Sequence, residues 1–406
     1  MHWKSITAAV ALAAIAGEAG AYGWYGPEPF RRDRIDSRQF IYNQESFIDR
    51  FSFEAQPAIN PRGVWQRDGF FGTAGSTRSN EFFVRTHVQK RIEFDVPMFA
   101  GVRFRRDEDF DGRYDRVLFG TGYQQGPWEV GVWGDVRGAK EEMDLQLEAA
   151  WSRDDEAWLR ATLVAADALF NSKQDTLARF EQKPRTLHLD AGLQLDEGQW
   201  LYGYANINAR SEFHDPTIDL NLTDEQFSAG LGWIQPLGTR FSLAVQGQGL
   251  YGRRDRQSLA DPQGLTQDLT RQFADSMVEL RHRLGSDRQA WYGMRYLSLR
   301  ERDLGLADIG PETYRDEAML YAGMRWQWRE SIAFAPTVFL GHIEARSGTP
   351  TQPGSIVDEK GVVGKLAPAV EFLVNRESGA SIVVNPTIKL HELGFGGGNV
   401  QVHFPF

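Results

Sequence analysis

Apolar and polar residues alternate with a period of two along most of the chain. One such segment carries an apolar face made of Ala318, Leu320, Ala322, Met324, Trp326 and Trp328. The chain closes with the same alternation, through Val400, Val402, Phe404 and Phe406. Because successive side chains of a strand point to opposite faces, this pattern predicts β-strands. The runs are about 9–15 residues long, which suits tilted strands that cross a membrane.

The connections between these runs alternate in length. Short connections are expected near residues 95–98, 124–127, 152–156, 195–199, 235–239, 284–289, 328–331 and 374–380. Longer or more polar connections are expected near residues 106–113, 168–184, 211–225, 252–271, 301–314 and 345–361. Outer-membrane barrels have short turns on one side and long loops on the other, whereas a soluble sandwich has no reason to sort its loops. The sequence therefore predicts an all-β fold, a transmembrane antiparallel up-and-down β-barrel.

The expected number of strands follows from parity. We count about 17 runs between Glu81 and Phe406, and single-chain bacterial barrels have an even number of strands. The short turn near 95–98 implies that the run before it begins outside the cell. One more strand must then precede it, with Gly72–Asn80 as its outer loop, and residues 61–71 or 46–55 can supply it. We expect about 18 strands, or 16 if one run is divided wrongly.

The N-terminal residues have the composition of an export signal. Lys4 supplies a positive charge, Ile6–Gly17 form a short apolar core, and Ala19-Gly20-Ala21 fits the small residues of a cleavage site. We expect residues 1–21 to be a signal peptide, with an uncleaved anchor helix as the alternative. The barrel is expected to span 61–406. Residues 22–60 are left as a periplasmic segment, a plug in the lumen or the first strand.

Composition excludes several classes of protein. The chain has 406 residues and a net charge of −10, which argues against nucleic acid as its main partner. It has no cysteine, so disulfides and thiolate metal sites are excluded. Beyond the N-terminus no stretch approaches the ~20 apolar residues that a spanning helix needs. A membrane β-barrel agrees with this composition, because lipid-facing and lumen-facing residues average out along each strand.

The polar face of each strand is expected to line the lumen. Because side chains alternate between the two faces of a strand, ten basic residues are expected there: Arg85, Arg91, Arg103, Arg105, Arg160, Arg281, Arg283, Arg295, Arg325 and Lys389. Guanidinium groups bind carboxylates by two-point contacts, so these residues are a candidate selectivity zone for anionic solutes. The alternative is that they pair with lumen acids such as Glu148, Glu279 and Glu371. The sequence leaves both interpretations open.

One acidic stretch between two runs has the spacing of a calcium loop. Alternate carboxylates can converge on Ca²⁺, and Gly112 permits a sharp turn. The predicted ligands are Asp107, Asp109, Asp111 and Asp115. Leu118 occupies the twelfth position, where an EF-hand has a bidentate glutamate. An Asp-Gly hairpin turn without a metal is the alternative, and no cofactor is required.

A search for catalytic groups finds no set that supports an enzyme. No run pairs a histidine with a serine as outer-membrane lipases do. The dyad His214-Asp215, with Asp219 nearby, is a combination that is common by chance in loops. The glycine-rich stretch that begins at Gly394 follows no βαβ pattern, so we expect an outer hairpin loop there. We therefore expect no enzymatic activity.

Taken together, the export signal, the alternating runs, the sorted connections and the terminal Phe404-Pro405-Phe406 resemble the porin-like, Gram-negative outer-membrane β-barrel superfamily. The resemblance covers most of the mature chain, and Pro405 is a small departure from it. It implies a location in the outer membrane, contact with outer-membrane lipid, and a last strand that the barrel-assembly machinery reads.

Three functional hypotheses follow from this resemblance. The leading one is a channel for small, anionic solutes. The second is an export pore for an acidic polysaccharide, because the chain is similar to alginate-exporter-type barrels in strand number and arginine content. The third is a closed barrel that serves as a surface scaffold or outer-membrane enzyme.

Overall fold

The structure is a computed structural model that describes part of the chain. The described residues are 68–76, 82–109, 112–135, 142–153, 156–171, 179–183, 185–196, 199–217, 219–257, 265–285, 288–303, 312–348, 357–375, 380–391 and 393–405. The proposed signal peptide, residues 22–60 and Phe406 lie outside these ranges. No helix within them is long and apolar enough to cross a membrane.

All regular structure in the described residues is β-strand. The first ten strands are β1 (Gly69–Ser76), β2 (Phe82–Glu93), β3 (Met98–Asp109), β4 (Gly112–Gln125), β5 (Trp128–Asp135), β6 (Glu142–Arg153), β7 (Ala157–Asn171), β8 (Arg179–Gln182), β9 (Arg185–Asp196) and β10 (Gln199–Asp215). The others are β11 (Leu220–Pro236), β12 (Phe241–Gln257), β13 (Leu265–Arg283), β14 (Arg288–Asp303), β15 (Glu312–Arg329), β16 (Ile332–Gly348), β17 (Val357–Asn375), β18 (Ala380–Lys389) and β19 (Gly394–Pro405).

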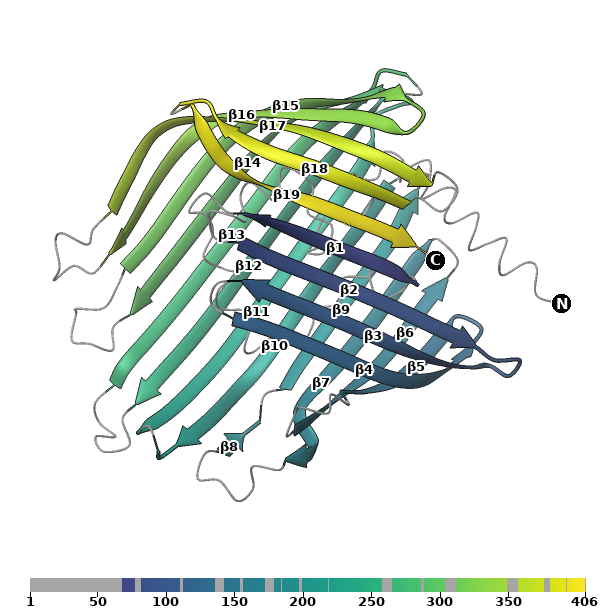
Figure 1. The fold of residues 1–406 in the computed structure, drawn as a ribbon, viewed down its shortest axis with the longest axis vertical. Helices are drawn as coiled ribbons and strands as arrows, with labels where there is room; N and C mark the ends of the chain where they lie inside the picture. Colours follow the sequence, from purple (N-terminus) through teal and green to yellow (C-terminus); the bar gives the residue numbers. More distant parts are fainter. Residues whose placement is uncertain are drawn as a thin grey trace.

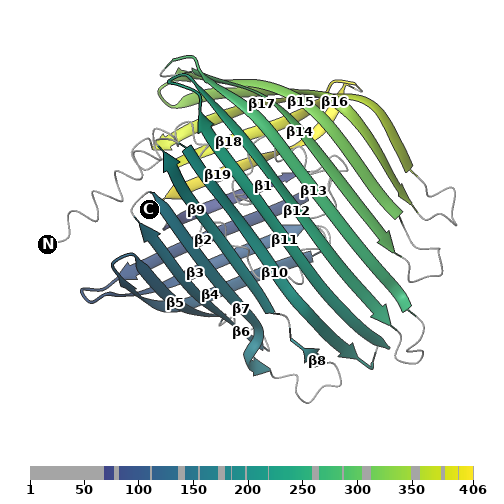
Figure 2. The ribbon, with the colours of Figure 1, turned by 180° about the vertical axis from the view of Figure 1, so that it is seen from behind.

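These strands form one antiparallel sheet that closes on itself (Figures 1 and 2). β1 closes the ring, because Gly72 lies opposite Val402 of β19 on one side and Thr86 of β2 on the other. β7 pairs directly with β9, so the short β8 lies outside the ring and pairs with the end of β10. All 19 described strands except β8 therefore belong to the closed wall. The predicted all-β antiparallel barrel is confirmed, and each described strand of the wall has a neighbour on both sides.

Several predicted connections are strands instead. β13 and β17 each have 19 residues, about twice the 9–11 residues that a membrane-crossing strand needs. Strand ends therefore occupy parts of the predicted long connections near 252–271, 301–314 and 345–361, and within the predicted connection at 106–113 strands β3 and β4 extend to Asp109 and from Gly112. Polar residues can pair across a backbone ladder as well as apolar ones do, so a polar segment can continue a strand.

Two glycine-rich stretches were also predicted wrongly. The expected outer loop Gly72–Asn80 begins inside β1, which supplies the strand that parity required. The expected hairpin loop at Gly394 is the start of β19, where Gly394 lies opposite Lys389 and Gly398 opposite Pro386. Glycine lowers the strand propensity of a segment, but ladder partners on neighbouring strands can override that local preference.

Side chains alternate between the two faces of the wall as predicted. The outward face carries large, exposed apolar residues, including Leu231 (61% exposed), Leu320 (65%) and Leu340 (58%). The inward face carries buried charged residues, including Glu279 and Glu317, both 0% exposed. The barrel is therefore apolar outside and strongly polar inside, the reverse of a soluble globular protein.

Inward aromatic side chains lie flat against glycines of neighbouring strands. The ring of Trp133 occupies the space where Gly120 would carry a Cβ, and Trp158 does the same over Gly192. Similar pairs are Tyr202 over Gly232, Trp291 over Gly323 and Tyr321 over Gly293. Tyr202 and Trp291 lie near strand ends and are buried on the inward face. Glycine lets these large rings pack along the wall.

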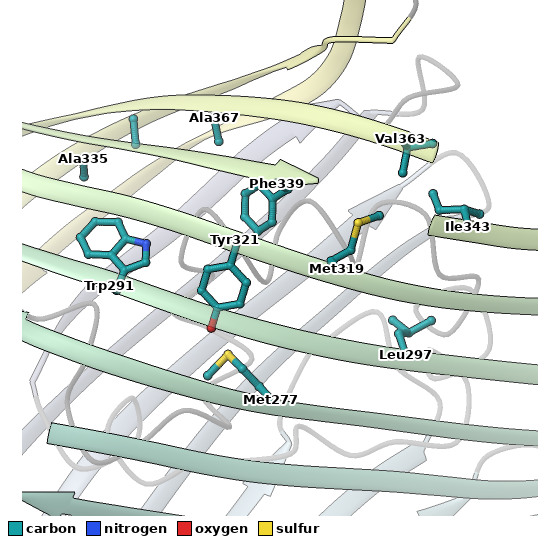
Figure 3. Close-up of a cluster of buried hydrophobic side chains, with 11 residues drawn as sticks. Met277, Trp291, Leu297, Met319, Tyr321, Ala335, Phe339, Ile343, Val363 and Ala367 are labelled. Carbon is teal, nitrogen blue, oxygen red and sulfur yellow. The ribbon is translucent and has the colours of Figure 1, made fainter. Parts of the chain in front are cut away.

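The inward face of β13–β17 also carries an apolar cluster, which Figure 3 shows in close-up. It contains Met277, Trp291, Leu297, Met319, Tyr321, Ala335, Phe339, Ile343, Val363, Ala367 and Ala369. The polar residues of each run predict a polar inward face, so this apolar cluster is a correction to that prediction. On β13, β14, β15 and β17 its residues are separated from the lumen charges of the same strand by even numbers of positions. The alternation of faces therefore places them inward as well.

A row of prolines interrupts the hydrogen-bond ladder on the outward face of β16–β18. Pro336 of β16 lies opposite Pro368 of β17. On the other side of β17, Leu366 lies opposite Ile388 and Val370 opposite Val384. This register places Pro386 of β18 opposite Pro368. Leu390 N donates to Gly364 O, so these two residues form a hydrogen-bonded pair of the β17–β18 ladder. Such pairs recur at every second position, which makes the facing Pro368 and Pro386 another of them. Two facing prolines at a hydrogen-bonded position remove both bonds of the pair, because neither has an N–H.

Candidate functional site

The candidate functional site is the inward wall of the barrel, where charged side chains form ion pairs. Arg103 Nη1 and Nη2 donate to Oε1 and Oε2 of Glu148 at 2.6 and 2.8 Å. Trp133 Nε1 donates to Glu148 Oε2 at 3.1 Å, and the guanidinium lies 3.6 Å from the centroid of the Trp133 ring. The two charges come from β3 and β6. They meet across β4 and β5, where the rings of Trp133 and Phe99 pack against Gly120 and Gly122.

Most of the other predicted arginines with described side chains also have acidic partners. Arg91 pairs with Glu129 at 3.1 Å, Arg281 with Glu279 at 2.8 Å, Arg295 with Asp275 at 2.5 Å and Arg325 with Glu371 at 2.8 Å. The pair of Arg315 with Glu317 was not predicted. At these positions the wall carries adjacent opposite charges.

Small residues on an intervening strand allow contacts between strands that are not neighbours. Tyr321 of β15 donates to Glu279 of β13 at 2.9 Å, and Gly293 of β14 lies between them in the register. Arg325 of β15 reaches Glu371 of β17 across β16, whose inward residues there include Ala333 and Ala335. These contacts join strands that share no ladder, so they brace the wall in addition to its backbone bonds.

The remaining predicted lumen residues differ in their surroundings. Arg160 is buried on β7, opposite Asp190 of β9. Arg283 is exposed at the end of β13. Lys389 is buried and lies opposite Lys365, a buried basic residue that was not among the predicted ones. Arg85 and Arg105 belong to β2 and β3 by their backbone, and their side chains lie outside the described part of the structure.

A row of uncharged polar groups and a histidine crosses β9, β10 and β11. Nδ1 of His188 contacts Oδ1 of Asn206, and Asn206 Nδ2 donates to Ser228 Oγ at 3.0 Å. One step along the barrel, Thr186 Oγ1 donates to Asn208 Oδ1 at 2.7 Å. None of these residues is among the predicted lumen residues, which are all charged. Its members occupy alternate strand positions, so parity alone could have placed them inward.

The predicted calcium ligands lie at the β3–β4 hairpin. The backbone register places Asp107 opposite Tyr114, Asp109 opposite Gly112 and Asp115 opposite Arg106. Asp111 and all four predicted ligand side chains lie outside what the structure describes. Within the described residues no group of His, Cys, Asp or Glu has the arrangement of a metal site. The calcium loop stays a prediction.

Comparisons with known proteins find similar structures but no sequence family. No family model matches the chain, and no curated protein matches it. OprD of Pseudomonas aeruginosa resembles it with a TM-score of 0.44 and 9% identity, covering 87% of this chain and 97% of that one. A BenF-like porin from Pseudomonas fluorescens Pf-5 has a TM-score of 0.43 and 10% identity, covering 85% and 100%. OccK2 of Pseudomonas aeruginosa, in complex with glucuronate, has a TM-score of 0.41 and 11% identity, covering 86% and 99%.

The chain's own surfaces define its class. A closed antiparallel ring, apolar and exposed on the outside and lined with ion pairs on the inside, is the architecture of a porin-like outer-membrane β-barrel. The fold and its two contrasting faces support this class and no narrower family.

Proposed function

We propose that the protein is an outer-membrane channel through which small solutes pass. The observation that carries this proposal is the closed ring of strands with a charged inner wall. In general, rings of about 8 strands are filled by side chains, whereas rings of about 16–18 leave room for an aqueous channel. The proposal is of a passive channel and includes no catalytic step.

The outward face supports a place in a lipid bilayer. Its exposed apolar residues come from strands all round the ring, including Val130 on β5, Leu159 on β7, Met294 on β14 and Val362 on β17. An arginine or lysine on this face at the bilayer centre would cost about 2–4 kcal/mol, which explains why the charges lie on the inward face. Together with the export signal expected at residues 1–21, this face supports the outer membrane as the location.

Within this proposal, a preference for anions is the finer hypothesis. The ion pairs of Arg91, Arg103, Arg281, Arg295 and Arg325 place a negative charge beside each positive one. The hypothesis is supported by Lys365 and Lys389, which are neighbours on β17 and β18 and bring two positive charges close together on the inward face.

Conductance in planar bilayers tests the channel. The full-length protein, purified and inserted into a bilayer, is expected to produce stable openings in KCl. The reversal potential in a KCl gradient then measures the preference for anions over cations. Correctly folded protein that inserts and never conducts would contradict the channel, and it would favour the scaffold hypothesis. Openings without preference for chloride would keep the channel and remove the anion hypothesis.

A further inference from the structure

Four polar atoms on adjacent residues of β7 and β9 have no hydrogen-bond partner. They are Arg160 Nη1, Thr162 Oγ1, His188 Nε2 and Asp190 Oδ2. Arg160 lies opposite Asp190, and Thr162 lies opposite His188. All four residues are on the inward face, and none is more than 6% exposed. We call these four residues the β7–β9 polar patch.

Neighbouring side chains hold two members of the patch in place. Asn206 uses its Nδ2 to donate to Ser228, so its Oδ1 accepts from Nδ1 of His188. A neutral His188 therefore presents Nε2 as an acceptor. Trp158 Nε1 donates to Asp190 Oδ1 at 3.1 Å, and the Trp158 ring lies against Gly192. The other carboxylate oxygen, Oδ2, lies 3.6 Å from His188 Nε2.

The patch thus offers one cationic donor, Arg160 Nη1, and two acceptors, Asp190 Oδ2 and His188 Nε2, which are close enough together to contact the same ligand group. Buried polar atoms without partners are rare in folded proteins and cost free energy, most of all when the group is charged. The partners that are missing are an anionic acceptor for Arg160 and a donor group that reaches both Asp190 and His188. An ammonium group suits the second role, because it carries three hydrogens and a positive charge.

We propose that the β7–β9 polar patch binds a small zwitterion, an amino-carboxylate that enters from the lumen. Its carboxylate binds Arg160, and its ammonium group binds Asp190 Oδ2 and His188 Nε2. The hydroxyl of Thr162 donates to the carboxylate or accepts from the ammonium group. A simple anion would leave Asp190 Oδ2 without a donor, and a simple cation would leave Arg160 Nη1 without an acceptor. The proposal rests on the proposed channel, since it names a class of solute that the channel would take up.

Calorimetry on the full-length barrel in detergent micelles tests the site with matched probes. The zwitterions are glycine and γ-aminobutyrate, and the controls for the latter are butyrate, which lacks the ammonium, and butylamine, which lacks the carboxylate. We expect at least one zwitterion to bind with one-to-one stoichiometry, and at least tenfold more tightly than either control. Loss of one charge-assisted hydrogen bond is worth roughly tenfold or more in affinity.

Substitutions identify the residues responsible. Arg160→Gln and Asp190→Asn should each weaken binding of the zwitterion about tenfold or more. Thr162→Val, which keeps both charges and the side-chain shape, should weaken it less. Arg240→Gln, which removes a positive charge from the exposed turn between β11 and β12, should leave binding unchanged. Heat-dependent mobility on SDS gels verifies that each variant is folded.

Three outcomes would overturn the site: neither zwitterion binds, butyrate or butylamine binds as tightly as γ-aminobutyrate, or folded patch variants all bind as the parent does. The first would indicate that ordered water satisfies the four atoms. Calorimetry needs no conductance, so the two proposals fail separately. A barrel that binds the zwitterion but never conducts contradicts the channel, and one that conducts but binds no zwitterion contradicts only the site.

Discussion

Tyr321 donates a hydrogen bond to Glu279 across an intervening strand, at 2.9 Å. The two residues belong to β15 and β13, and Gly293 of β14 lies between them. A side chain at residue 293 would occupy the place of the phenol ring. Glu279 also accepts from Arg281 at 2.8 Å, so one buried carboxylate joins a phenol and a guanidinium. The ladder sets the order of strands, and contacts of this kind tie strands two or more positions apart.

Gly293→Ala should destabilise the barrel by displacing Tyr321. The new Cβ meets the ring and its hydroxyl, and overpacking of this kind costs about 1–3 kcal/mol. Urea unfolding in detergent or lipid, followed by tryptophan fluorescence, measures the change. Gly252→Ala is the matched control, because a Cβ there has only ordinary contacts, at 3.8 Å. Equal stability of the two variants would show that Tyr321 can move aside without loss.

Glu148→Gln should destabilise the barrel strongly. It leaves the buried guanidinium of Arg103 without its charged partner, and breaking a buried ion pair from one side costs about 3–5 kcal/mol. The same unfolding measurement applies. Glu212→Gln removes a carboxylate from the more exposed pair with Arg210 and should change stability by less than about 1 kcal/mol. A similar small effect at Glu148 would mean that the pair contributes little.

Removal of lumen arginines should shift selectivity toward cations. Replacing Arg281, Arg283 and Arg295 with glutamine leaves Glu279 and Asp275 without their cations. The wall then becomes more negative, so the reversal potential in a KCl gradient should move in the cation-selective direction. The double variant Arg281→Gln with Glu279→Gln keeps the net charge and should shift it much less. An unchanged reversal potential in the triple variant would remove these arginines from the selectivity hypothesis.

The facing prolines should create a local weakness between β17 and β18. We expect the amides of Val384 and Ile388, which flank the interrupted position, to exchange with solvent faster than those of Ala367 and Ala369 on the continuous β16–β17 side. Pro368→Ala together with Pro386→Ala restores two N–H donors and should slow that exchange about tenfold, since each bond contributes about 1 kcal/mol. Pro336→Ala restores a donor elsewhere and should have no effect there. Mass spectrometry of the exchanged protein provides the measurement.

The hairpin at 107–115 is expected to bind calcium weakly. Extracellular calcium modules have dissociation constants of about 10⁻⁴–10⁻³ M. Calorimetry with CaCl₂ should show binding that Asp109→Ala and Asp111→Ala each abolish. Asp95→Ala removes a carboxylate from the exposed turn between β2 and β3 and serves as the control. Heat that persists unchanged in both hairpin variants would place any calcium elsewhere.

The inward position of the charged residues was predictable, whereas their partners were not. Arg103 and Glu148 are 45 residues apart, and nothing in the local pattern near either one points to the other. Parity decides only which face a side chain occupies. The partner depends on register across several strands and on glycines that clear the path between them. The same limit applies to Tyr202 and Trp291, because an aromatic residue near a strand end has the same local pattern whether it faces lipid or a glycine of the next strand.

By itself, the sequence determined the all-β antiparallel barrel and the division of residues between an apolar outer face and a polar inner face. Period-two alternation is a local property, so it can be read without knowing which strands are neighbours. Only the tertiary structure decided how far the strands extend, which charges pair, where apolar and aromatic residues gather inside, and that Arg160, Thr162, His188 and Asp190 form one patch. Those features depend on register and closure, which are set by contacts between residues far apart in the chain.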